Sequence, residues 1–176
     1  LEDDRIAVDV HIQGDSILHI VFAAEFTEDI GEIRWLNLSG EQTATLRTEG
    51  AHHVFEPTEH GTIAWPAVDI RDWYDEKRDE TITIVGDRLM ESQPDGTTVE
   101  LFNIWDHEDP TRHDQWHAAF YEQGFDWTHA NGVHYSPERD SYLLSLGHID
   151  TIYELDRTTG TPLQRINNDW VLRSST

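Results

Sequence analysis

The fold is decided by a short pattern that is clearest in Ile152-Tyr153-Glu154-Leu155-Asp156-Arg157-Thr158-Thr159-Gly160, where a strand pattern runs into a polar turn closed by glycine. Glycine adopts positive φ without a steric penalty, so such a turn sends a second strand back beside the first. The same pattern runs from Ile33 to Gly40 and from Leu89 to Gly96. Its spacing is a little above the blade repeat of about 40 to 50 residues that is usual in β-propellers. The repeat therefore favours a propeller, with a generic β-sandwich as the alternative.

Short β-type runs separated by turn residues fill most of the chain, and helical periodicity is scarce. The charged segment 69–80 is predicted to be an exposed loop, and 106–125 to hold a short helix around 115–121. We expect one all-β domain over residues 1–176, a partial β-propeller of about three to four blades. The predicted strands are 5–12, 16–23, 32–38, 43–47, 81–85, 88–92, 97–105, 141–146, 151–155 and 162–166.

The composition is strongly acidic, with 35 Asp and Glu residues against 12 Lys and Arg and a formal charge of −23. Such a charge repels itself unless salt screens it, so we expect a halophilic protein. Aromatic residues and apolar runs are spread along the chain, which argues against a disordered acidic tail. Binding to nucleic acid or to an anionic membrane needs clustered cations that the sequence lacks. The sequence also contains no membrane-spanning apolar run and no cysteine for a disulfide, a thiolate nucleophile or a zinc site.

A histidine and an asparagine lie close together in Asp126-Trp127-Thr128-His129-Ala130-Asn131, just before a hairpin pattern that includes Ser145-Leu146-Gly147-His148. A pair of histidines occurs earlier, in Ala51-His52-His53-Val54. Together with the run 152–160, these motifs resemble the signature of the arylsulfotransferase family of six-bladed β-propellers. The resemblance extends over roughly positions 30 to 170 and is strongest over 126–160.

The resemblance implies an enzyme that moves a sulfuryl group from a phenyl sulfate ester to a phenol through a sulfohistidine, with no nucleotide sulfate donor and no cofactor. It also implies that His129 stabilises charge and shuttles a proton, and that Asn131 donates to a sulfate oxygen. His52, His53 and His148 are the implied substrate-binding residues. Imidazole suits this chemistry, because it titrates near neutrality and its cation stabilises the negative charge on transferring sulfuryl oxygens.

The sequence departs from the family pattern in ways that bear on activity. Gly147 stands where the family has an arginine that holds sulfate oxygens, and Val54 replaces an acidic residue after the histidine pair. The resemblance assigns the nucleophilic histidine to a later blade, beyond Thr176. We therefore expect a fragment that is inactive alone, and a non-catalytic propeller that binds a ligand or protein partner is the alternative. The family favours an extracytoplasmic or secreted location, with any export signal ahead of Leu1.

A zinc site is a rival interpretation of another histidine pair. His113 and His117 have the i, i+4 spacing that puts two rings on one helix face, and His107, Asp109 and Asp114 lie near them. This spacing is common by chance, and the segment lacks the glutamate that follows the first histidine in zinc proteases. We therefore expect no metal.

Overall fold

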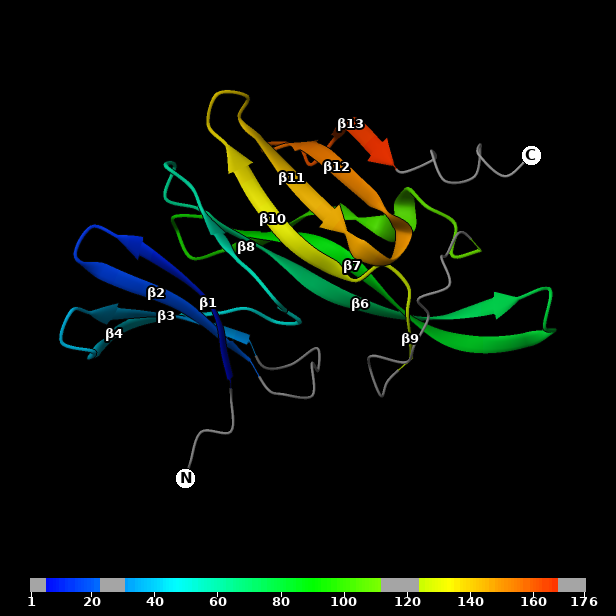
Figure 1. Cartoon of the computed structure of the whole chain (residues 1–176), viewed down its shortest axis with the longest axis horizontal. Coiled ribbons are helices and arrows are strands. Elements are labelled where there is room, and N and C mark those ends of the chain that lie inside the picture. The colour runs from blue at the N-terminus through cyan, green and yellow to red at the C-terminus, as the bar shows by residue number, and fades with distance from the viewer. Residues whose placement is uncertain (1–5, 23–30, 112–123, 168–176) are drawn as a thin grey trace.

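The computed structural model describes residues 6–22, 31–111 and 124–167, and within them the chain is built almost entirely of β-strands (Figure 1). Two single-turn 3-10 helices, η1 (Ile104–Asp106) and η2 (Gly147–Ile149), are the exceptions among these residues. The all-β prediction is confirmed. Within the described ranges, no helix is long and apolar enough to cross a membrane. The strands are β1 (Ile6–Gln13), β2 (Ser16–Phe22), β3 (Gly31–Asn37), β4 (Gln42–Arg47), β5 (Glu56–Pro57), β6 (Ile63–Asp75), β7 (Glu80–Ser92), β8 (Thr98–Asn103), β9 (Phe125–Asp126), β10 (Ala130–Ser136), β11 (Ser141–Leu146), β12 (Thr151–Asp156) and β13 (Pro162–Asn167).

The strands form three sheets that follow one another along the chain. Strands β1 to β4 make the first sheet, β5 to β8 the second, and β10 to β13 the third. Within each sheet, neighbours in sequence pair antiparallel, and β9 joins the second sheet by pairing with β7 in parallel. Successive four-stranded meanders are the building plan of a propeller, so a partial propeller remains our interpretation of the fold.

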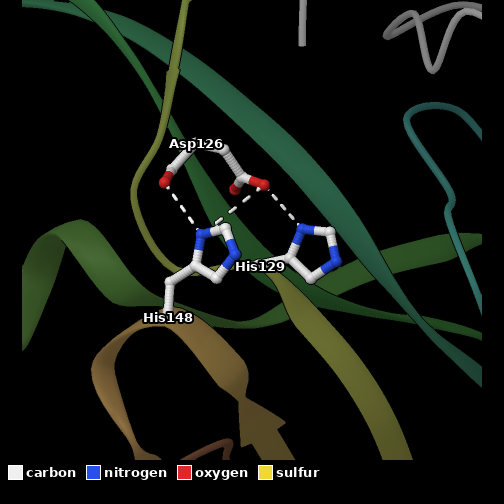
Figure 2. Close-up of side chains that lie close together, drawn as sticks. All are labelled: Asp126, His129 and His148. Atoms are coloured by element: carbon white, nitrogen blue, oxygen red, sulfur yellow. Dashed lines mark hydrogen bonds and ion pairs between the residues drawn. The ribbon is translucent and has the colours of Figure 1, made fainter. Parts of the chain in front are cut away.

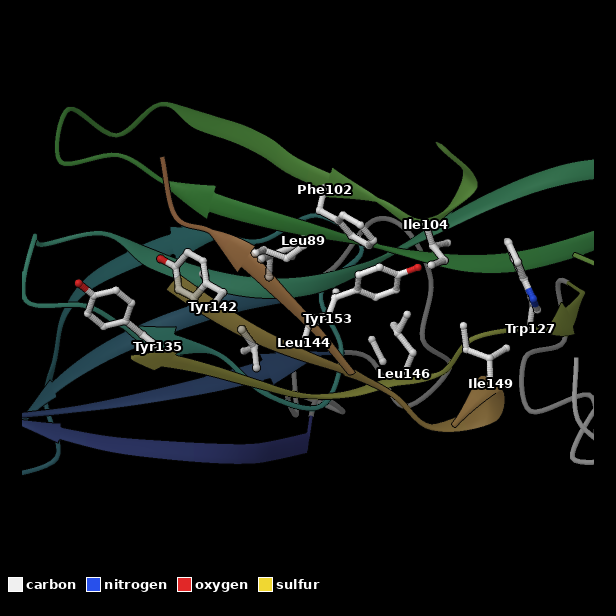
Figure 3. Packing of buried hydrophobic residues seen from close by; sticks show 14 of the residues in the cluster. Leu89, Phe102, Ile104, Trp127, Tyr135, Tyr142, Leu144, Leu146, Ile149 and Tyr153 are labelled. Atoms are coloured by element: carbon white, nitrogen blue, oxygen red, sulfur yellow. The ribbon is translucent and has the colours of Figure 1, made fainter. Parts of the chain in front are cut away.

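Apolar side chains fill the space between successive sheets. Ile20 and Ile33 of the first sheet form one buried cluster with Trp65 of the second. A larger cluster joins the second and third sheets, and Figure 3 shows Leu89 and Tyr142 among its members. Each fully buried side chain of this size contributes about 1.5–3 kcal/mol relative to an exposed one. These two clusters pack the first sheet against the second and the second against the third.

The predicted strands match the observed ones over most of the described chain, and the predicted strands 81–85 and 88–92 are parts of the single strand β7. The prediction of a loop over 69–80 is wrong. Strand β6 continues to Asp75 and β7 begins at Glu80, with residue pairs unbroken from Ile63 and Ser92 to the end of the hairpin. Because β7 satisfies the backbone of this segment, its charged side chains can face solvent without ending the strand. The predicted helix around 115–121 lies outside the described residues.

The glycines that close the three repeated turns adopt the left-handed conformation that the pattern requires. Gly40, Gly96 and Gly160 have φ values of 82°, 85° and 68°. At Gly160 a second constraint applies, because an added Cβ would lie 1.6 Å from the carbonyl oxygen of Leu101. This position therefore needs glycine both for its backbone angle and for the close approach of β8.

Candidate functional site

The segment between β9 and β10 is held on two sides by backbone hydrogen bonds. The amide of Trp127 donates to the carbonyl of Val85 in β7 at 2.9 Å. On the other side, the amide of Gly147 donates to the carbonyl of His129 at 3.1 Å, and that of His148 to the carbonyl of Thr128 at 3.0 Å. These bonds clamp the His129 segment between the second sheet and η2, so His129 and His148 lie beside each other.

The buried carboxylate of Asp126 holds both of these histidines (Figure 2). Its Oδ2 atom lies 2.5 Å from Nδ1 of His129 and 3.6 Å from Nδ1 of His148, whose Nδ1 also lies 3.0 Å from the Asp126 carbonyl oxygen. The two rings stack with their centroids 4.6 Å apart and their planes within 15°. The hydrogen bond to Asp126 outweighs the effect of burial and raises the pKa of His129.

A second buried carboxylate, Asp87 of β7, holds the histidine pair. Its Oδ1 atom lies 2.7 Å from Nε2 of His52, while Oδ2 accepts hydrogen bonds from the Thr128 hydroxyl at 2.6 Å and the Ala130 amide at 2.7 Å. Burial alone would raise the pKa of Asp87, but the interaction with His52 and the two further donors hold it below its ordinary value. Asp87 therefore links the loop of His52 to the segment of His129.

His53 lies between the two carboxylate-held groups. Its Nδ1 atom is 2.9 Å from Nδ1 of His52, and its ring meets that of His129 edge to face with centroids 4.8 Å apart. Burial, together with the neighbouring His52 and His129, lowers the pKa of His53 to about 4, although Asp87 opposes this shift. His52, His53, His129 and His148 thus form a continuous row, and the structure brings together the four histidines that the family resemblance singled out.

Two histidines of the row have unusual backbone conformations. His53 has φ of 63° and His129 has φ of 50°, in the left-handed region that costs a residue with a Cβ about 1–2 kcal/mol. Such strain persists where the surrounding structure imposes it, and it concentrates at functional sites. Asp126 holds the ring of His129 directly, whereas Asp87 holds His52, whose Nδ1 lies 2.9 Å from Nδ1 of His53.

Asn131 is exposed on β10, next to Gly147 of η2. A Cβ added to Gly147 would lie 2.9 Å from Nδ2 of Asn131 and 3.5 Å from the carbonyl oxygen of His129. The Asn131 amide therefore occupies space that any side chain at position 147 would need. A side chain at position 147 would therefore need the Asn131 amide to move aside.

Asp87 and Asp126 are the site residues that the sequence analysis missed. Asp126 stood within the quoted motif, three residues before His129, and could have been noticed as a carboxylate partner for it. Asp87 gave no comparable signal. It lies in a strand 35 residues from His52, and the two come together because the His52 amide donates to the carbonyl of Pro66 in β6, which pairs with β7.

Asp126, His129 and His148 are also the group in the described residues that could hold a metal ion, with one ligand atom of each within 4.8 Å of the others. The two rings are nearly parallel, so lone pairs on their Nδ1 atoms run side by side and do not converge on one point. Both Nδ1 atoms instead meet oxygens of Asp126 at hydrogen-bond distance. This geometry fits hydrogen bonding better than metal ligation. The earlier candidates His113 and His117 lie outside the described residues.

Comparison with known proteins places most of the chain in one family. The model of the arylsulfotransferase (ASST) family matches residues 10–162, which include most of the chain and all the site residues named above. No curated protein matches the chain with significance. The matched residues run from β1 in the first sheet to Pro162 at the start of β13 in the third. The chain therefore belongs to the arylsulfotransferase (ASST) family.

Proposed function

We propose that the histidine row binds the sulfuryl group of an aryl sulfate and takes part in its transfer to a phenol through a sulfohistidine. Family membership makes the chain arylsulfotransferase-like, with aryl sulfates and phenols as its substrate class. The observation that carries the proposal is the contact between His53 and His129, two imidazoles of different environment whose centroids lie 4.8 Å apart. A sulfuryl group placed beside both rings could contact a ring nitrogen of each histidine at the same time.

His129 is the residue that we assign to charge stabilisation. Its raised pKa means that a larger fraction of His129 is protonated near neutral pH. Because Nδ1 bonds to Asp126, the Nε2 proton of the imidazolium points away from that carboxylate. A positive donor fixed in advance lowers the energy of the charge that develops on sulfuryl oxygens. The Asn131 amide, close to His129 across Gly147, is the second proposed donor. His129 would then supply the positive charge that the family obtains from an arginine at position 147.

The other two histidines act from the flanks of this pair in our proposal. The ring of His148 stacks on that of His129 and covers one of its faces. His52 is fully buried, and its two ring nitrogens lie within hydrogen-bond distance of Asp87 and His53. The sequence analysis made His52 and His53 donors to substrate. These contacts instead lead us to place His52 behind His53, as a residue that positions its neighbour.

The test is the binding and turnover of 4-nitrophenyl sulfate in high salt, with phenol as acceptor. We expect His129→Ala to weaken binding at least about tenfold, since a charge-assisted hydrogen bond is worth about 1.5–3 kcal/mol. His134→Ala is the matched control, because His134 is an exposed histidine of the same strand region and pairs with Glu56 instead. Equal binding by wild type and His129→Ala would reject the proposed site.

Gly147 is the one observation that favours a second function, that of a propeller which binds a ligand without catalysis. A missing cation weakens the binding of the transition state, on which charge develops, more than it weakens the binding of a ground-state ligand. Release of 4-nitrophenol that depends on His129 supports transfer. Binding that depends on His129 without release is expected both of the ligand-binding function and of a chain that, as the sequence predicts, is inactive alone.

A further inference from the structure

A cavity of about 310 Å³ lies between the first and second sheets. Its lining comes from the end of β4 and from β6, β7 and β8, and consists of Arg47, Glu49, Trp65, Arg88, Met90 and Thr98. Neighbouring residues of a strand point to opposite faces of a sheet. In β7, Arg88 therefore faces this cavity, whereas Asp87 faces Thr128 on the other side. The second sheet thus separates the cavity from the histidine row.

Two nitrogen donors of the lining residues have no acceptor in the part of the chain that the structure describes. They are Nε1 of Trp65, a residue that is 1% exposed, and Nε of Arg88. Indole and guanidinium nitrogens can only donate hydrogen bonds. A buried donor without an acceptor is costly, because it has lost its hydrogen bonds to water. Native proteins contain few such groups, so two of them at one cavity point to a ligand with acceptor atoms.

The charges around the cavity favour a ligand with a single negative charge. Arg47 pairs with Glu49, and Arg88 pairs with Glu100, each with a nitrogen–oxygen distance of 3.5 Å. The charges of these four side chains cancel, so a dianion would be repelled by both glutamates without a surplus of positive charge nearby. A monoanion gains charge-assisted hydrogen bonds from a guanidinium with less repulsion.

The size and the lining of the cavity favour an organic ligand over water or chloride. One water molecule takes up about 30 Å³ in the liquid, far less than the volume of the cavity. Trp65 and Met90 also belong to the apolar cluster between the first and second sheets, so they give the cavity an apolar side. The side chains of Arg47 and Glu49 are 68% and 67% exposed, which places the other side at the surface. A ligand can therefore enter past these two residues.

We propose that this cavity binds an organic monoanion, which is a carboxylate or a sulfate monoester attached to an apolar group. Its oxygens accept hydrogen bonds from the indole N–H of Trp65 and from the guanidinium of Arg88. The apolar group lies against Met90, and Arg47 adds a second cation at the entrance. Both unpartnered nitrogens are buried, so the flexible side chains of the two arginines adjust as the ligand enters. This site goes beyond the proposed function and does not depend on it.

The experiment follows the indole N–H signals of the seven tryptophans by ¹H–¹⁵N NMR. The signal of Trp65 is assigned by its loss in Trp65→Phe. We expect benzoate or 4-nitrophenyl sulfate to move this signal downfield in a saturable way, because the N–H gains an acceptor. Separate titrations show whether the carboxylate or the sulfate monoester binds more tightly. The indole N–H of Trp105 already donates to the carbonyl of Asp69 at 3.2 Å, so its signal should move little.

Substitution of the arginines tests which groups hold the anion. We expect Arg88→Gln to weaken binding at least about tenfold, through loss of a hydrogen bond from a charged group. Arg78→Gln is the matched control, since Arg78 lies in the turn of the same β6–β7 hairpin and should leave binding unchanged. Arg47→Gln removes an exposed cation and should also weaken binding. If Arg88→Gln does not fold, Arg47→Gln and the wild-type titration decide the matter.

Three results would overturn the inference. The first is a Trp65 signal that neither organic anion moves. The second is an equal movement on addition of sodium chloride, which would make the cavity a site for any anion. The third is a movement that His129→Ala abolishes, because it would assign the binding to the histidine row. Retention of the movement in His129→Ala supports the new site, whether or not the proposed function fails.

Discussion

The rings of His53 and His129 meet edge to face with their centroids 4.8 Å apart, although His53 belongs to the loop between β4 and β5 and His129 to the segment before β10. Each is held from behind by its own buried carboxylate, Asp87 through His52 and Asp126 directly. The pKa of His53 is lowered while that of His129 is raised. Two imidazoles whose pKa values are shifted in opposite directions are therefore in direct contact. Because each depends on a different carboxylate, Asp87 and Asp126 can be substituted separately.

The lowered pKa of His53 predicts a dependence of stability on pH. The unfolded chain binds a proton at this residue near pH 6.5, but the folded chain does so only near pH 4. Between these values the unfolded state holds more protons, so folding stability is full above about pH 6.5 and falls as the pH drops toward 4. Urea unfolding of wild type and His53→Gln over this range checks the prediction. The wild type should lose stability more steeply, and parallel curves would contradict it.

Asp126→Asn should lower the pKa of His129 while leaving the ring in place. The Oδ2 atom faces both histidines, and the other oxygen, Oδ1, has no hydrogen-bond partner among the described residues. An amide can therefore keep its oxygen toward the rings and turn NH₂ to the unpartnered side, so that only the charge is lost. We expect a lower pKa of His129 by NMR titration and weaker binding of 4-nitrophenyl sulfate at pH 7. Asp140→Asn, on a distant carboxylate, serves as the control.

Gly147→Arg should strengthen the binding of aryl sulfates. An arginine at this position needs the Asn131 amide to move, because the new Cβ would lie 2.9 Å from its Nδ2, but this atom ends a flexible side chain. A guanidinium that reaches the sulfate would add about 1.5–3 kcal/mol, or roughly tenfold or more in affinity. Gly147→Met has a similar steric demand without the charge and should not gain affinity. Equal affinities of the two variants would show that position 147 does not face the ligand.

Gly160→Ala should cost more stability than Gly96→Ala. Both glycines have positive φ, at 68° and 85°, so each alanine pays about 1–2 kcal/mol for the left-handed backbone. Only at Gly160 does the new Cβ meet the backbone of Leu101, whereas Gly96 has open space around it. The difference in free energy of unfolding between the two variants isolates the steric contact. Similar losses would mean that β8 moves away from the turn without penalty.

The sequence predicted most strands because β-branched, aromatic and aliphatic residues gather in short runs between turn residues, as in β12. It failed at β6, where charged residues such as Asp69 and Asp72 imitate a loop although the backbone pairs with β7 throughout. Strand β10 was also not predicted, since Asn131 and Gly132 at its start are typical turn residues. Local composition cannot show that a partner strand satisfies a polar segment.

The histidines of the site could be found in the sequence because they lie in short motifs, but their relationships could not. The positive φ of His53 and His129 could not be predicted from the sequence, because a histidine does not by itself indicate the left-handed conformation. Asp87 is one of many acidic residues in an acidic chain, and its role follows only from its burial and its distance to His52. The chemistry of single residues was therefore predictable, whereas the carboxylate behind each histidine was not.

The stability of the fold should rise with salt. A formal charge of −23 leaves most carboxylates without a basic partner, so they repel one another over the Debye length. That length falls from about 30 Å at 0.01 M to about 3 Å at 1 M salt, which removes the repulsion at longer range. We expect the melting temperature to increase over this range.

A variant with Glu59, Glu76 and Glu138 changed to Gln removes three exposed charges and should gain less from salt than the wild type, since it has less repulsion to screen. An equal gain in both proteins would assign the effect to general salting-out of apolar surface, and a wild type that gains nothing would mean that its charges are already compensated by bound cations.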